Sequence, residues 1–194
     1  MKGKLIVLYG INNLGKTTQA KMLADRLRRD GHKTEYIKYP VYALAPSGPL
    51  LNEYLRKGNP HTLNARELQL LYAFNRAQYE PALRATLANG THVVAEDYYG
   101  TGIAWGEGYG VDGQFLREIN SAFIKEDIAL FLHGKRFTFA IEKNHTHEED
   151  AALVERVRTA HERLAKEYHW TPVEVTDGKE KVHEKIWNVT KKLL

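Results

Sequence analysis

The chain contains no cysteine among its 194 residues, which excludes disulfides and thiolate metal sites. It also lacks long apolar runs: none exceeds five residues, as at 5–9 and 128–132, whereas a membrane-spanning helix needs roughly 20. Charge of one sign does not dominate, because 28 basic and 24 acidic residues are interleaved. We therefore expect no membrane anchor and no nucleic-acid partner. The first residues also lack the long apolar region of a secretory signal, so we expect a cytoplasmic protein.

The composition is that of a globular protein, with 43% hydrophobic and 27% charged residues. A chain of this length can bury roughly 70% of its unfolded surface without disulfides. No internal repeat, low-complexity tract or long linker divides it. We predict a single domain over residues 1–194.

Strand-like and helix-like patterns alternate along the chain. Strands are predicted near residues 4–8, 33–38, 92–96, 128–132 and 173–176. Helices are predicted near residues 16–29, 49–56, 65–79, 148–168 and 179–194, with Pro81 starting a separate helix over 81–87. The glycine-rich residues 106–110 are interpreted as a flexible connection. This order predicts an α/β fold with a five-stranded parallel sheet and helices on both faces, whose ligands collect at the carboxyl ends of the strands.

The segment GINNLGKT, residues 10–17, fits the phosphate-binding pattern G-x-x-x-x-G-K-[ST] between a predicted strand and a predicted helix. Backbone N–H groups of such a loop, together with the helix N-terminus, surround phosphate oxygens. We therefore predict a P-loop NTPase fold that binds ATP and Mg²⁺. Lys16 would reach the β- and γ-phosphates, and the Thr17 hydroxyl would coordinate Mg²⁺. The nucleotide-binding residues are predicted to be Gly10, Asn12, Asn13, Leu14, Gly15, Lys16, Thr17 and Thr18.

A phosphate loop alone does not separate GTPases, large ATPases and small-molecule kinases. The N-K-x-D motif that GTPases use to read guanine is absent, and the chain is short for a large ATPase with partner domains. The third predicted strand ends in Glu96 and Asp97, at the sheet edge where the phosphate loop lies. A carboxylate there can hold Mg²⁺ or accept a proton. These features favour a small-molecule kinase, with Glu96 also predicted to bind the metal.

Several further segments together resemble the thymidylate kinases over nearly the whole chain. They are GINNLGKTTQ at 10–19, YP at 39–40, LYAFNR at 71–76, EDYYGTGIAW at 96–105, ERVR at 155–158 and VHEKIW at 182–187. The resemblance implies transfer of the ATP γ-phosphate to dTMP, with dTDP and ADP as products. It also implies a Mg²⁺ requirement, a small-molecule nucleotide substrate and a homodimer.

The resemblance also implies roles for residues that would bind the acceptor. Tyr72 would stack on the pyrimidine, Arg76 and Thr101 would approach the base edge, and Trp105 would exclude a ribose 2′-hydroxyl. Stacking of this kind contributes roughly 1–3 kcal/mol per base. The predicted substrate-binding residues are Asn12, Tyr39, Tyr72, Arg76, Asp97, Thr101 and Trp105.

Four positions depart from the family pattern. Glu96-Asp97 stands where the family has aspartate then arginine, Tyr42 lies where a second arginine is frequent, and Asn12 replaces an aspartate that touches the sugar. Both family arginines grip the acceptor phosphate, and their loss would weaken its binding by on the order of 3–6 kcal/mol. Either Lys38 or another base compensates, or the acceptor is a neutral nucleoside, or the protein binds nucleotide without efficient transfer.

Residues 133–147 are predicted to form the lid over ATP. Arg136 in this segment, together with Lys16, Glu96 and Asp97, completes the predicted catalytic set. The sequence thus predicts an ATP-dependent kinase, and the resemblance implies a nucleoside monophosphate kinase acting on dTMP. A deoxynucleoside kinase acting on thymidine and a non-catalytic nucleotide-binding module remain the alternatives.

Overall fold

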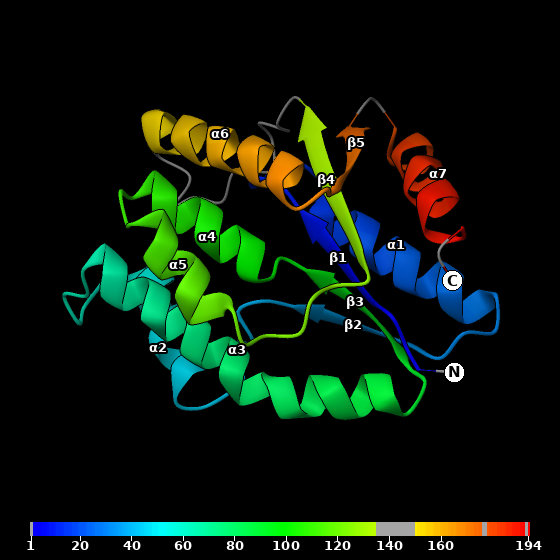
Figure 1. Ribbon diagram of the computed structural model, residues 1–194, viewed down its shortest axis with the longest axis horizontal. Helices are drawn as coiled ribbons and strands as arrows, with labels where there is room; N and C mark the ends of the chain where they lie inside the picture. The colour runs from blue at the N-terminus through cyan, green and yellow to red at the C-terminus, as the bar shows by residue number, and fades with distance from the viewer. Residues whose placement is uncertain (1, 135–149, 176–177, 193) are drawn as a thin grey trace.

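The computed structural model describes residues 2–134, 150–175, 178–192 and 194. Its centre is a single parallel sheet in the order β2-β3-β1-β4-β5 (Figure 1). The strands are β1 (Leu5–Tyr9), β2 (Thr34–Lys38), β3 (His92–Glu96), β4 (Ile128–Gly134) and β5 (Thr171–Val175). This sheet confirms the predicted five parallel strands.

Helices cover both faces of the sheet, as the sequence predicted (Figure 1). They are α1 (Lys16–Arg29), α2 (Ser47–Lys57), α3 (Ala65–Ala88), α4 (Tyr99–Gly108), α5 (Gly113–Asn120), α6 (Ala151–Glu167) and α7 (Lys179–Thr190). Helices α1 and α7 pack together on one face, whereas α4 packs against α3, α5 and α6 on the other. None of the described helices has the length and apolar character needed to span a membrane.

Strand β1 is the centre of the core. All five of its side chains, LIVLY, are 0% exposed, because the strand lies between β3 and β4 and helices cover both of its faces. The register pairs both Leu8 and Lys38 with Glu96. The loops that follow β1, β2 and β3 therefore meet at one edge of the sheet.

Helix α3 corrects the prediction of two helices separated at Pro81. It runs unbroken through Pro81, starting from a capping box in which Asn64 and Glu67 bond each other's backbone N–H. An internal proline removes one helical hydrogen bond and costs about 3 kcal/mol. Burial of Leu83 and Leu87, beyond the proline, offsets this cost. The residue type alone does not reveal that compensation.

Of residues 106–110, predicted to form a flexible connection, only 109 and 110 lie between two helices. Gly106 and Gly108 lie inside α4, and α5, which the sequence analysis missed, packs directly beside this segment. A Cβ on Gly106 would lie 2.6 Å from Leu116 Cδ2 of α5 and 3.2 Å from Gln69 Cγ of α3. The missing side chain therefore allows three helices to approach closely.

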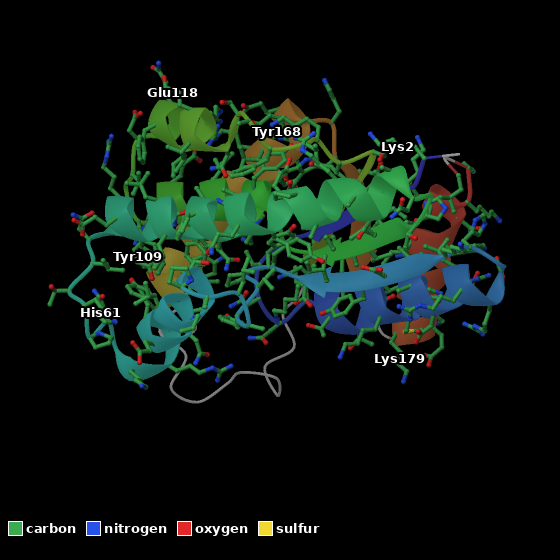
Figure 2. All side chains as sticks on the ribbon, turned by 90° about the horizontal axis from the view of Figure 1, so that it is seen from below. Lys2, His61, Tyr109, Glu118, Tyr168 and Lys179 are labelled. Atoms are coloured by element: carbon green, nitrogen blue, oxygen red, sulfur yellow. The ribbon has the colours of Figure 1, made fainter. Side chains whose placement is uncertain are left out.

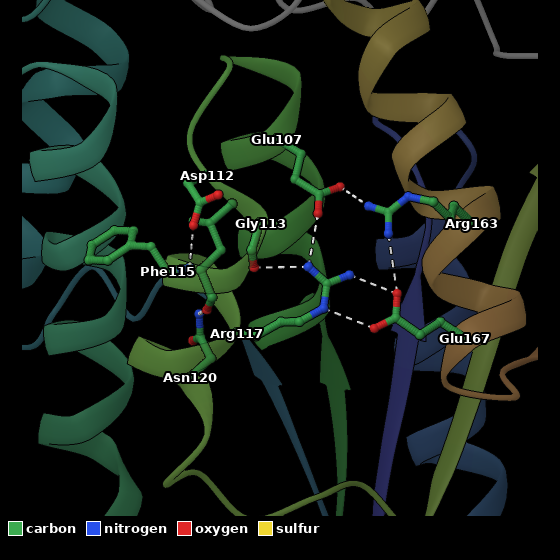
Figure 3. A network of polar contacts seen from close by, with 9 residues as sticks. Glu107, Asp112, Gly113, Phe115, Arg117, Asn120, Arg163 and Glu167 are labelled. Carbon is green, nitrogen blue, oxygen red and sulfur yellow. Dashed lines mark hydrogen bonds and ion pairs between the residues drawn. The ribbon is translucent and has the colours of Figure 1, made fainter.

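An ion-pair network joins α4, α5 and α6 (Figure 3). Arg117 donates to the two carboxylate oxygens of Glu167 at 2.9 and 2.7 Å and to Glu107 Oε1 at 3.1 Å. Arg163 pairs with the same two glutamates. Single surface pairs contribute about 1 kcal/mol or less, but a shared network of this kind fixes relative orientation better than isolated pairs do. It helps to hold α4, which carries Thr101 and Trp105.

Candidate active site

A cavity of about 800 Å³ opens at the carboxyl ends of β1, β2 and β3. It extends from Arg56 of α2 to Lys179 of α7. In Figure 2, His61 just beyond α2 and Lys179 mark opposite sides of the molecule. The predicted site residues that line it are Asn12, Asn13, Leu14, Gly15, Lys16, Thr17, Thr18, Tyr39, Tyr72, Arg76, Glu96, Asp97, Thr101 and Trp105. A volume of this size is typical of small-molecule sites.

The loop between β1 and α1 is shaped by backbone conformations that few residues adopt. Gly10 has φ 136°, and a Cβ there would lie 2.5 Å from the Leu132 carbonyl oxygen, so only glycine fits. Gly10 lies behind the cavity rather than on its wall. Asn13 (φ 65°) and Gly15 (φ 77°) are also left-handed. The loop leads directly into the N-terminus of α1, where free N–H groups and the helix dipole favour an anion.

Lys16 is buried at the centre of the loop, with 5% of its surface exposed. Its Nζ donates to the carbonyl oxygens of Gly10 and Ile11 at 2.8 and 2.9 Å. The same atom lies 3.7 Å from Asp97 Oδ1. The ammonium group is therefore held in place before any phosphate arrives.

Glu96 is almost completely buried and has a partner at each carboxylate oxygen. Its Oε1 accepts from Thr17 Oγ1 at 2.8 Å and pairs with Lys38 Nζ at 3.0 Å, while Oε2 accepts from Tyr36 OH at 2.8 Å. Burial by itself raises the pKa of Glu96, but the charges of Lys38 and Lys16 outweigh burial and hold the pKa below its ordinary value. Glu96 is thus ionised at neutral pH.

Asp97 is the second carboxylate of the site, and its environment differs. Burial raises the pKa of Asp97, and the charge of Glu96 adds to this effect against the opposing charge of Lys16. Its Oδ1 accepts from Thr101 Oγ1 at 2.8 Å. The backbone of Asp97 is left-handed, with φ 62°, a strained conformation that often marks functional sites.

The opposite wall of the cavity comes from α3 and α4 and is aromatic. Tyr72 and Arg76 lie one turn apart on α3, and Trp105 of α4 lines the same cavity. Arg76 is 3% exposed and donates from Nη2 to Asn120 Oδ1 at 2.8 Å. Burial lowers the pKa of Arg76 to about 10, so the guanidinium keeps its charge at neutral pH. This wall combines rings with a fixed cation, which suits a planar ligand with acceptor atoms.

Sequence reasoning missed several residues of the site. Gln69, Tyr98 and Arg56 line the cavity, and Tyr36 reaches Glu96 from the middle of β2. Asn75 was included in a motif without a role; its amide bonds the backbone N–H and carbonyl of Val41 and the Ser47 hydroxyl. It therefore anchors the loop after β2. The seven-residue spacing of Gln69 and Arg76, which puts both on one helical face, was the available signal for Gln69.

Part of the prediction lies outside the described residues. This applies to Arg136 and to residues 135–147 of the predicted lid. Within the described ranges, no three histidine, cysteine or carboxylate side chains converge as a metal-binding group.

A phosphate loop between the central strand and the first helix, with carboxylates at the adjacent strand end, defines a P-loop phosphotransferase. The opposite wall, with its aromatic rings and guanidinium, narrows the class to enzymes that hold a planar acceptor beside the donor phosphates. The class is thus a small-molecule kinase rather than a GTPase switch.

Comparison with known proteins gives the family. The thymidylate kinase family model matches residues 8–186. Human thymidylate kinase is 29% identical over 196 residues, which cover 95% of this chain and 88% of that protein. Thymidylate kinase of Synechococcus sp. (strain RCC307) is 28% identical, over 98% of this chain and 97% of that protein. The solved structure of thymidylate kinase from Candida albicans has a TM-score of 0.81 at 24% identity, covering 99% of this chain and 93% of that one.

The chain belongs to the thymidylate kinase family. The family match and the structural likeness confirm the predicted P-loop NTPase fold.

Proposed function

We propose that this protein catalyses phosphoryl transfer from ATP to dTMP, with ADP and dTDP as products. The observation that carries the proposal is that two kinds of group line one cavity. The phosphate loop supplies Lys16, and α3 and α4 supply Tyr72, Arg76 and Trp105. An acceptor held against the rings would direct its phosphate toward Lys16.

The reaction needs positioning more than covalent participation by the protein. An oxygen of the acceptor 5′-phosphate attacks the γ-phosphorus of ATP, and the bond from that phosphorus to the β,γ-bridging oxygen breaks. The electron pair of that bond leaves with ADP. Lys16, fixed by the Gly10 and Ile11 carbonyls, would stabilise the negative charge on the transferring group.

The site has a donor set that fits Mg²⁺. Thr17 Oγ1 and Glu96 Oε1 are hard oxygen donors 2.8 Å apart at the start of α1. When bound, the metal ion would neutralise charge on the β- and γ-phosphates. Thr17 would coordinate it, and Glu96 would coordinate it directly or through water. Lys38 pairs with the same carboxylate oxygen at 3.0 Å.

Lys38 is our candidate for the acceptor phosphate in place of the missing arginines. It lies at the end of β2, lines the cavity and is 46% exposed at its side chain. Burial lowers its pKa, but the charges of Glu96 and Asp97 outweigh this and raise the pKa above its ordinary value. Lys38 therefore stays cationic at neutral pH. Arg56 of α2 lines the same cavity and provides a further positive charge there.

One observation favours a second candidate function, a deoxynucleoside kinase. Asp97 stands beside Lys16, where a carboxylate repels an acceptor phosphate but can accept a proton from a nucleoside 5′-hydroxyl. Whether dTMP or thymidine is the better acceptor depends on whether the positive charges of Lys38 and Arg56 outweigh the negative charge of Asp97.

A single assay separates these functions. ADP release is followed with Mg²⁺ and ATP in the presence of dTMP, dUMP, dGMP, thymidine or deoxycytidine. We expect the highest kcat/KM with dTMP. Faster turnover of thymidine than of dTMP would support the nucleoside kinase, and ATP binding without turnover of any acceptor would support a non-catalytic module.

We also propose a homodimer built on the outer face of α3. Leu70 and Phe74, one turn apart, are 45% and 46% exposed, unusual for large apolar side chains. They border a shallow groove that also includes Leu50, Leu63 and Leu71. Sedimentation of the purified protein would test this assembly. A cytoplasmic location remains the expectation from the sequence, and cell fractionation would test it.

A further inference from the structure

Gln69 of α3 has a buried side-chain amide that the fold leaves unused. The residue is 1% exposed, and neither Oε1 nor Nε2 has a hydrogen-bond partner among the described residues. A buried amide without partners is unfavourable, and native proteins contain few of them. Such a group needs an explanation, and a ligand that is absent from the structure is one.

The position of Gln69 points to the acceptor end of the cavity. Gln69, Tyr72 and Arg76 follow one another at spacings of three and four residues, so they share one face of α3. All three line the cavity, as does Trp105. The Nε of Arg76 is likewise buried and unpartnered in the part of the chain described. Two side chains of this helix face thus carry unpartnered buried polar atoms at the cavity.

Asn75, six residues further along the same helix, provides the contrast. It is 0% exposed, yet its amide accepts from Val41 N at 2.7 Å and donates to Val41 O and Ser47 Oγ at 3.0 and 2.8 Å. Asn75 faces the protein and is satisfied by it. Gln69 faces the cavity and is not. Both side chains are almost equally buried, so the difference in hydrogen bonding arises from the direction in which each side chain points.

We propose that Gln69 reads the edge of the pyrimidine base and so determines acceptor specificity together with Arg76. Its Oε1 would accept from N3–H of thymine, and its Nε2 would donate to the adjacent base carbonyl oxygen. A carboxamide presents an acceptor and a donor side by side, which matches this edge in a bidentate contact. The choice of thymine rests on the proposed function; the base-reading role rests on the unpartnered amide.

The test compares Gln69→Leu with wild type, using Gln78→Leu as the matched control on the same helix but outside the cavity. We expect kcat/KM for dTMP to fall by about 10- to 100-fold in Gln69→Leu, with the KM for ATP changed less than about twofold. The ligand-free melting temperature should stay the same or rise, because the substitution removes an unsatisfied amide. Gln78→Leu should leave kcat/KM for dTMP unchanged.

A modified acceptor tests the proposal on the wild-type protein, even if Gln69→Leu fails to fold. In 3-deaza-dTMP a C–H group replaces N3–H and the C4 oxygen is a hydroxyl, so the edge loses its match to the carboxamide, and the wild-type protein should use it about 10-fold less efficiently than dTMP. In Gln69→Leu the two acceptors should be used almost equally. Equal use of both by the wild-type protein, or unchanged dTMP turnover in Gln69→Leu, would overturn the proposal.

Failure of the proposed function can be distinguished from failure of the Gln69 proposal. If wild type phosphorylates no monophosphate, the dTMP kinase function is wrong. Calorimetry with thymidine and 3-deazathymidine then decides the role of Gln69 alone. Tighter binding of thymidine supports the role, whereas equal binding or no binding of either ligand contradicts it.

Discussion

The two ends of the cavity handle their buried polar groups differently. At the phosphate loop, Lys16 and Glu96 already have protein partners, so this end is preorganised without nucleotide. At the α3 end, Gln69 and the Nε of Arg76 have none among the described residues. The first end is built to hold charge in a fixed place, which catalysis requires. The second leaves hydrogen-bonding capacity for a ligand, which specificity requires.

The largest effect should come from breaking the preorganised end. We expect Lys16→Ala to lower kcat/KM by roughly 10²–10³-fold, because it removes a fixed charge from the transferring phosphate. Steady-state ADP release measures this. Lys57→Ala is the control, since Lys57 is exposed and pairs only with Glu53 among the described residues. Activity of Lys16→Ala within tenfold of wild type would contradict the assignment.

The same contrast explains how much of the site could be predicted from the sequence. The phosphate loop is a contiguous motif, so its residues and their place between β1 and α1 could be predicted. The α3 end combines residues from α2, α3 and α4. Only the family resemblance pointed to Tyr72, Arg76 and Trp105 there. Gln69 belongs to no sequence motif. Only the fold reveals that its side-chain amide is buried without a hydrogen-bond partner.

The fold was predictable for a similar reason, and its errors have local causes. Alternation of strand-like and helix-like segments determined the parallel sheet. Pro81 was wrongly predicted to separate two helices, because the burial of Leu83 and Leu87 is tertiary information. The glycines at 106 and 108 were wrongly assigned to a connection, because helix packing and flexibility both favour glycine.

His161 offers a second test of the contrast, with an effect on stability. It is 0% exposed on α6, stacks on Phe131, and has its Nε2 unpartnered within the described residues. Unlike Gln69, it does not line the cavity. Burial lowers the pKa of His161 to about 3, against 6.5 for the exposed ring. As pH falls below 6.5, the unfolded chain binds a proton that the folded protein does not, so stability is lost.

The expected loss for His161 is roughly 1.6 kcal/mol between pH 6.5 and 5.0, equivalent to about 16-fold in the folding equilibrium. Urea denaturation at the two pH values measures it. His161→Phe should remove this part of the loss and leave dTMP turnover at neutral pH unchanged. Two results would contradict this prediction: an equal loss of stability in wild type and His161→Phe, or a change in base selectivity in His161→Phe. Either would show that lining the cavity does not distinguish the role of Gln69 from that of His161.

Lys38 tests whether the acceptor end has its own phosphate contact. Lys38→Met should raise the KM for dTMP by about tenfold, because it removes a half-exposed charge-assisted contact. Lys38→Arg should largely retain the contact. Lys33→Met, an exposed lysine just before β2, is the matched control. Steady-state kinetics with dTMP and with thymidine measures the effect, and an equal change for both acceptors would exclude a contact specific to phosphate.

Asp97 should give the smallest effect and the finest distinction between the two functions. Asp97→Asn removes the negative charge beside Lys16, keeps an acceptor for Thr101, and tolerates the left-handed backbone at φ 62°. With less repulsion of the acceptor phosphate, the KM for dTMP should fall by about threefold. The ratio of kcat/KM for dTMP to that for thymidine measures the change. If Asp97 instead accepts a proton from a nucleoside hydroxyl, kcat/KM for thymidine will fall by about 10²-fold while kcat/KM for dTMP stays constant. That result would contradict the proposal that Asp97 lies beside an acceptor phosphate.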